Sequence, residues 1–145
     1  ACRWQVMGRP IPKGRPRMTR TGRVYTPAAT LKAERAFAEI SAAHAPPEPL
    51  EGGLILRLDY VFEPAKSWSK KKKASALRGE LTHTTRPDLD NLVKLTSDAL
   101  EGLFFKNDTQ IVSIEASKRY GPQALTRVEI VQRSKGEGRI EVDRS

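Results

Sequence analysis

The sequence predicts an α+β fold in two layers, with helices packed on a mixed β-sheet. Apolar residues alternate with period two over 54–62, as in a strand, whereas those after Asp88 recur at helical spacing. Segments of both kinds are interleaved along the 145 residues, and the last two predicted strands are close enough to form a hairpin. The length is that of one ordinary domain, so we expect a single domain over residues 1–145.

Each predicted element has its own signal. Thr26 and Pro27 are typical of a helix N-cap and first position, and the alternative caps Ser67 and Ser69 precede a short lysine-rich helix. Asp88 is a natural N-cap for the next helix, which we expect to end near Gly102. In chain order we expect a strand at 4–8, a basic loop at 9–27, a helix to about residue 44, a strand at 54–62, a basic excursion at 64–87 holding the short helix, a helix from 88, strands at 109–120 and 125–133 paired across 121–124, and a frayed tail at 134–145.

The charge is large and unevenly placed. The formal net charge is +9, which indicates a polyanionic partner: nucleic acid, an anionic membrane surface or an acidic protein. Ala1–Ala33 contains eight basic residues and no acid, and Lys70–Lys73 forms a second basic block. The basic residues do not fall on one face of an amphipathic helix, and 18 apolar residues never run together, so a membrane is disfavoured.

Other observations bear on the compartment. Cys2 is the single cysteine, which excludes an intramolecular disulfide and a cysteine-rich zinc site. Residues 1–10 hold no apolar run of signal-peptide length. We therefore expect a cytoplasmic protein.

An acidic island interrupts the basic chain between residues 86 and 110. On the helix from Asp88, the residues Asp90, Lys94 and Asp98 are four apart and share one polar stripe, and Asp108 follows the helix. Asp108 can reach Asp88 only if the strand at 109–120 runs back antiparallel to the helix or beside its middle. Three carboxylates together need a cation, and the hard ion Mg²⁺ prefers such oxygen ligands. Beside a phosphodiester this arrangement is typical of a metal-dependent nuclease.

Each of these residues also has a purely structural interpretation. An aspartate at a helix start is usually a cap, and Asp90 with Lys94 is an ordinary surface pair at i,i+4. Asp108 fits a turn, and Lys70–Lys73 fits a solvated charge run. Spacing alone therefore leaves both interpretations open.

The motif around these residues is long and specific. It runs Asp-x-Asp-Asn-Leu-x-Lys from Asp88 to Lys94, continues as Asp-Ala-Leu and an apolar turn, and closes with Asp-x-Gln-Ile-Val from Asp108. It closely resembles the signature of the RusA family of Holliday junction resolvases, found in bacteria and prophages. "GRPRMTR" and "YTP" resemble the N-terminal part of phage-type members, and the resemblance extends from about Trp4 to Val131.

The resemblance implies a function and a set of site residues. It implies a homodimeric, RusA-like endodeoxyribonuclease that depends on Mg²⁺, with Mn²⁺ able to substitute. Such an enzyme resolves four-way DNA junctions by paired symmetric nicks in recombination and repair. Encoded by a bacterium or phage, it would be associated with the nucleoid. The metal-binding aspartates fall on Asp88, Asp90 and Asp108, and the essential lysine on Lys94. The basic residues expected to contact DNA are Lys13, Arg15, Arg17, Lys70, Lys71, Lys72, Lys73, Arg86 and Lys118.

The chain departs from the family pattern at two positions. Members often carry an acidic pair before the x-Gln step, where this chain has Asn107 and then Asp108. The residue before the first aspartate is often basic, whereas here it is Pro87, with Arg86 one step earlier.

Two rival interpretations remain. One is a non-catalytic nucleic-acid-binding module whose acids are structural. The other is a restriction-type nuclease using Pro87–Asp88 with Glu115 and Lys118. That arrangement needs the acid and the lysine two residues apart, but these two are three apart and would face opposite sides of a strand.

Overall fold

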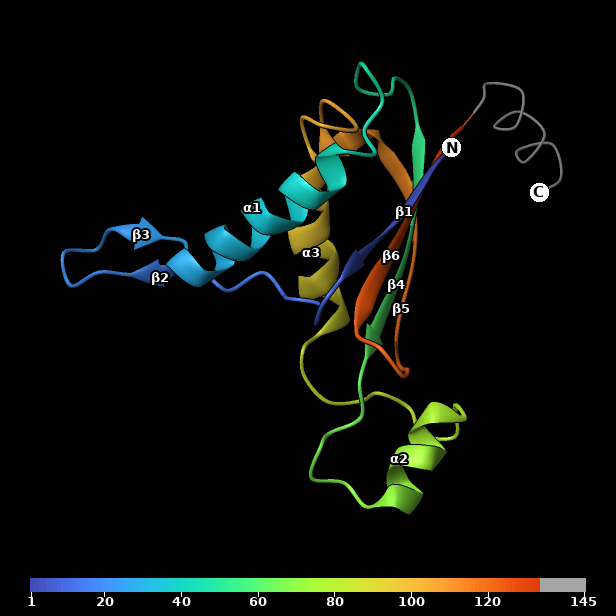
Figure 1. The fold of residues 1–145 in the computed structure, drawn as a ribbon. Coiled ribbons are helices and arrows are strands. Elements are labelled where there is room, and N and C mark those ends of the chain that lie inside the picture. The colour runs from blue at the N-terminus through green and yellow to red at the C-terminus, as the bar shows by residue number, and fades with distance from the viewer. Residues whose placement is uncertain (134–145) are drawn as a thin grey trace, which may run out of the picture.

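The structure is a computed structural model that describes residues 1–133 (Figure 1). The predicted tail at 134–145 lies outside the described residues. Four strands form one mixed sheet in the order β1–β6–β4–β5, in which β4 and β5 are parallel and the other pairs antiparallel. Their bounds are Cys2–Met7 for β1, Leu54–Phe62 for β4, Ile111–Tyr120 for β5 and Leu125–Gln132 for β6.

Two helices cover one face of this sheet. These are α1, Ala28–Ala42, and α3, Leu89–Leu100, which pack against each other (Figure 1). Alternate residues of β4 point into the core, where they meet the apolar face of α3, including Leu92 and Leu100, both fully buried. Each such side chain contributes about 1.5–3 kcal/mol by leaving water. The two-layer α+β prediction is confirmed.

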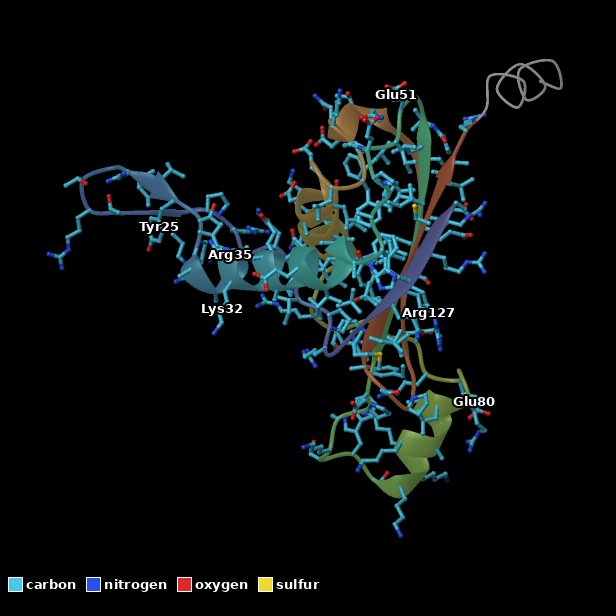
Figure 2. The ribbon with its side chains drawn as sticks, turned by 45° about the horizontal axis from the view of Figure 1, so that its top comes forward. Tyr25, Lys32, Arg35, Glu51, Glu80 and Arg127 are labelled. Atoms are coloured by element: carbon cyan, nitrogen blue, oxygen red, sulfur yellow. The ribbon has the colours of Figure 1, made fainter. Side chains whose placement is uncertain are left out.

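The other face of the sheet carries no helix among the described residues, and ion pairs cover it. Arg57 bridges Glu115 on β5 and Glu129 on β6 at 2.9 and 3.3 Å. Asp59 accepts from Arg119 and Arg127, both at 3.0 Å, and Figure 2 shows Arg127 on this side of the molecule. A sheet face that is open to solvent takes polar residues. The ion pairs on this face therefore explain why Arg57 and Asp59 alternate with buried apolar residues along β4.

Two segments project away from the layered body. One is a hairpin made of β2, Arg17–Met18, and β3, Val24–Tyr25. The other contains α2, Lys70–Leu77. Its N-cap is Ser69, one of the two caps that the sequence predicted, and the Ser69 side chain accepts a hydrogen bond from the Lys72 N–H. Figure 1 shows the N-terminal end of α3 between these two projections.

The structure corrects three expectations. Strands β5 and β6 are not hairpin partners, because β4 lies between them. The four residues 121–124 are still long enough to connect β5 to β6, since the distance to bridge is about 10 Å, twice the spacing of adjacent strands. The basic loop at 9–27 contains the β2–β3 hairpin. The N-cap of α1 is Pro27 rather than Thr26, and it makes no side-chain cap bond.

Candidate functional site

Asp88 and Asp90 lie at the N-terminal end of α3 with their carboxylates exposed. Asp88 occupies the predicted N-cap position, but its side chain accepts no capping hydrogen bond. Asp90 lies in the first turn, and its Oδ1 accepts only from the Asn91 N–H, at 3.0 Å. Within residues 1–133 neither carboxylate takes part in an ion pair. Both are therefore free to meet a cation.

The backbone leading into Asp88 is held by Lys118 from β5. Its Nζ donates to the carbonyl oxygens of Thr85 and Pro87 at 2.6 and 2.9 Å. Strand β5 thus runs antiparallel to α3: its C-terminal end meets the Asp88 end of the helix, and its N-terminal end, next to Asp108, lies at the other end. Lys118 is one of the residues predicted to contact DNA, and here its ammonium group makes two hydrogen bonds within the chain.

His83 also helps to fix the segment that leads into Asp88, because its side chain is buried. Its ring is buried between Phe62 and Tyr120, with centroid distances of 4.6 and 4.8 Å. Burial, together with the charges of Lys118 and Arg9, lowers the pKa of His83 below its ordinary value. The ring is therefore favoured in its neutral form. Sequence reasoning missed this residue, because an isolated histidine in a polar segment carries no periodic signal.

A hollow of about 490 Å³ opens beside Asp88. The guanidinium-bearing residues Arg15 and Arg86 line it together with Asp88 and Asn91. The N-terminal segment is fixed here because the Lys13 N–H donates to the Asn91 carbonyl oxygen at 2.9 Å. The two arginines give the hollow a cationic border next to Asp88.

The ammonium groups of Lys13 and Lys94 both contact Asp98, which lies one turn after Lys94 in α3. Lys13 Nζ lies 2.7 Å from Glu34 on α1 and 3.0 Å from Asp98, and Lys94 lies 3.4 Å from Asp98. Burial opposes the charge of Lys13, but the hydrogen bonds to Glu34 and Asp98 prevail and raise its pKa. Lys13, one of the residues predicted to contact DNA, ties the N-terminal segment to both helices. Lys94 keeps 58% of its side chain exposed.

Asp108 lies at the opposite end of α3. Its backbone N–H donates to Glu101, the C-cap of the helix, at 2.9 Å. A helix of 12 residues is about 18 Å long. Asp108 therefore does not meet Asp88 and Asp90 within one chain, and residues 1–133 contain no group of three His, Cys, Asp or Glu side chains that could hold a metal.

The departure at Asn107 has a structural explanation. Asn107 caps the short 3-10 helix Asp108–Gln110, accepting from the Thr109 N–H at 2.9 Å. The Gln110 side chain accepts from two backbone N–H groups and donates to the carbonyl oxygens of Leu50 and Gly52. These hydrogen bonds hold the turn that carries Asp108 in place, and the side-chain amide of Asn107 caps its short helix.

The remaining predicted residues lie on the two projections. Lys70–Lys73 form the first turn of α2, and Lys72 lies 4.1 Å from the Trp68 ring centroid. Arg17 is on the exposed hairpin. The restriction-type arrangement fails, because Glu115 pairs with Arg57 on the open face of the sheet while Lys118 contacts the segment before Asp88.

The fold is α+β, and its candidate site sets exposed carboxylates beside guanidinium groups. The family model for endodeoxyribonuclease RusA matches residues 7–131, nearly the whole chain. The chain therefore belongs to the RusA family of endodeoxyribonucleases. It is also similar to the uncharacterized protein YqaN of Bacillus subtilis (strain 168), with 36% identity over 137 residues, which cover 90% of this chain and 94% of YqaN. In residues 1–133 no helix has the length and apolar character needed to cross a membrane.

Proposed function

We propose that the chain is a Mg²⁺-dependent, structure-specific endodeoxyribonuclease that resolves four-way DNA junctions by paired nicks. The observation that carries the proposal is the pair of exposed, unpaired carboxylates of Asp88 and Asp90 beside the cationic hollow. Family membership supports the nuclease chemistry and junction DNA as substrate. Such an enzyme would act in recombination and repair.

The donor set fits a hard divalent cation. Carboxylate oxygens that are exposed and without ion-pair partners are the ligands that Mg²⁺ or Mn²⁺ would take from Asp88, Asp90 and Asp108. When bound, the ion supplies charge stabilisation and an activated water for phosphodiester hydrolysis. Arg15 and Arg86 would hold the phosphates next to the site, and Lys70–Lys73 would hold a more distant DNA segment. Lys94 would stabilise the charge that develops on the phosphate oxygens.

A second copy of the chain completes the proposed site. Asp108 of one copy would lie against Asp88 and Asp90 of the other if a twofold axis set the two α3 helices antiparallel, giving two equivalent sites. The edge strand β5 supports such pairing, because Val112 and Ile114 expose 55% and 48% of their surface at the sheet edge. Two equivalent sites would cut two strands symmetrically.

Cleavage of a labelled four-way junction tests the proposal. We expect nicks with Mg²⁺ or Mn²⁺, none with EDTA, and slower cutting of linear duplex and single strand. Asp90→Asn should cut at less than about one-hundredth of the wild-type rate. It should still bind the junction, because it removes a negative charge that faces phosphates.

Two results would overturn the assignment. Asp90→Asn protein that cuts at the normal rate in Mg²⁺ would remove these carboxylates from the chemistry. Junction binding by the wild type without cleavage in either metal would favour the non-catalytic binding module.

A further inference from the structure

The hairpin at residues 15–25, here called the basic arm, contacts nothing else in the described chain over most of its length. Every residue from Arg15 to Tyr25 is exposed. Figure 1 shows β2 and β3 extending beyond the N-terminal end of α1, and Figure 2 shows Tyr25 far from the sheet. A lone two-stranded hairpin is only marginally stable in water, so an arm of this kind gains most from a binding partner.

The arm nevertheless has a defined backbone. Thr19 and Arg23 close its tip: the Thr19 N–H donates to the Arg23 carbonyl oxygen at 2.8 Å, and the Arg23 N–H donates to Thr19 Oγ1 at 3.0 Å. Gly22 takes the positive φ of +85° that this turn requires. The root is fixed to α3 through Lys13, as described above. The arm is therefore a built extension whose root lies at the Asp88 site.

The two faces of the arm differ in chemistry. Residues directly opposite in an antiparallel pair share a face, so Arg17 lies beside Tyr25, and Met18 lies beside Val24 on the other face. Arg23, two residues before Tyr25, falls on the Arg17 face because side chains alternate along a strand. One face thus presents two guanidinium groups and a phenol, and the other presents two apolar side chains.

We propose that the Arg17, Arg23 and Tyr25 face of the basic arm docks on one double-stranded arm of the junction, outside the catalytic site; this rests on the function proposed above. The row of cations is continuous, since Arg15 lines the Asp88 hollow and the arm begins there. A two-stranded ribbon is narrow enough to enter the major groove. Arg17 and Arg23 contact phosphate oxygens, and Tyr25 packs against the sugar or base edge.

Charge selects DNA over a second copy as the occupant of this face. No acid precedes Glu34 in the sequence, and within residues 1–133 the arginines of the arm have no carboxylate partner. Guanidinium groups left without partners on an exposed ribbon bind phosphate readily, often in bidentate geometry.

The test measures binding of a fluorescent four-way junction to protein carrying Asp90→Asn, over a series of salt concentrations. Combining Arg17→Gln with Arg23→Gln should weaken binding about tenfold or more, and should reduce the slope of log K against log salt by about two, since each lost phosphate contact removes about 0.9. Tyr25→Ser should weaken binding with little change of slope.

Two matched controls isolate the face. Arg3→Gln with Arg127→Gln makes the same charge change on the open sheet face, and Met18→Thr with Val24→Thr changes the other face of the arm; both should keep the wild-type affinity and slope. Unchanged affinity and slope in the arginine variant would overturn the proposal. The proposal would also be overturned if the Met18 and Val24 variant lost its dimer on ultracentrifugation and its DNA binding fell only in proportion to that loss. The arm would then be a contact between two protein copies.

The measurements of affinity and salt slope do not require the protein to cleave DNA. Failure of the wild type to cut in Mg²⁺ would count against the proposed function alone, whereas an unchanged salt slope would count against the arm alone. Circular dichroism on each variant checks that the fold is retained, as expected for exposed positions outside the core.

Discussion

The aspartates flanking the two ends of α3 are held alike, and both differ from Asp98 within the helix. At the N-terminal end Lys118 fixes the backbone before Asp88, and at the C-terminal end Gln110 fixes the turn that carries Asp108. In both places the backbone is tied down while the aspartate carboxylate is left exposed. Asp98, in the last turn of α3, is the reverse case, since its carboxylate is held by Lys13 and Lys94.

This difference separates structural acids from chemical ones. A carboxylate paired with two ammonium groups has little capacity left for a metal ion, whereas an exposed one on a rigid backbone is ready for it. The comparison also raises the central question of the site, which is how two ends about 18 Å apart act on one phosphate.

Mixing two inactive variants gives the largest expected effect. Asp90→Asn and Asp108→Asn should each be inactive alone, because each damages every site. If one copy contributes the Asp88 end and the other the Asp108 end, random exchange makes half of the dimers mixed, and one of their two sites is intact. Nicking should then return to about a quarter of the wild-type level.

The matched control is a mixture of Asp88→Asn with Asp90→Asn, which damages the same end twice and should stay inactive. Absence of recovery in the first mixture, with subunit exchange verified by differently tagged copies, would show that each site is formed within one chain.

Removing the Gln110 side-chain bonds tests the Asp108 end. Gln110→Leu deletes four hydrogen bonds, to two N–H groups and two carbonyl groups, and should lower the free energy of unfolding by about 2 kcal/mol. Urea unfolding measures it. Gln132→Leu deletes one bond, to the Glu51 carbonyl, and should cost less than about 1 kcal/mol. Equal losses in the two variants would contradict the structural role given to Gln110.

Lys118→Met tests the Asp88 end in the same way. The change removes a charged donor from two carbonyl groups and should destabilise the protein by about 1–2 kcal/mol. The junction cleavage rate should fall as well, because Asp88 follows the released segment directly. Lys106→Met, an exposed lysine near the other end, serves as control. A variant that keeps both stability and rate would show that Lys118 does not position the segment.

The sequence predicted the helix and its acids but not their spatial relation. Asp88 at the N-cap position and the helix that follows it came from local signals, namely a capping residue and apolar spacing. The direction of β5 relative to α3 had no such signal. The order of strands had none either, because the short link 121–124 suits a hairpin equally well and only tertiary packing puts β4 between β5 and β6. Likewise the sequence does not reveal the partner of a lysine: Lys13 pairs with Glu34, and Lys118 donates to the Thr85 carbonyl oxygen.

The smallest effect concerns pH and His83 at the Asp88 end. Its pKa is lowered in the folded protein from an ordinary value near 6.5, first by burial. Between that lowered pKa and 6.5 the unfolded chain binds more protons than the folded one, so the unfolding free energy should fall as the pH drops below 6.5. The slope contributed by one group stays below about 1.4 kcal/mol per pH unit. His83→Phe, which keeps a ring between Phe62 and Tyr120, should flatten the curve between pH 7 and 5. Denaturant unfolding at several pH values measures this, and an equal slope in His83→Phe and the wild type would place the pH sensitivity elsewhere.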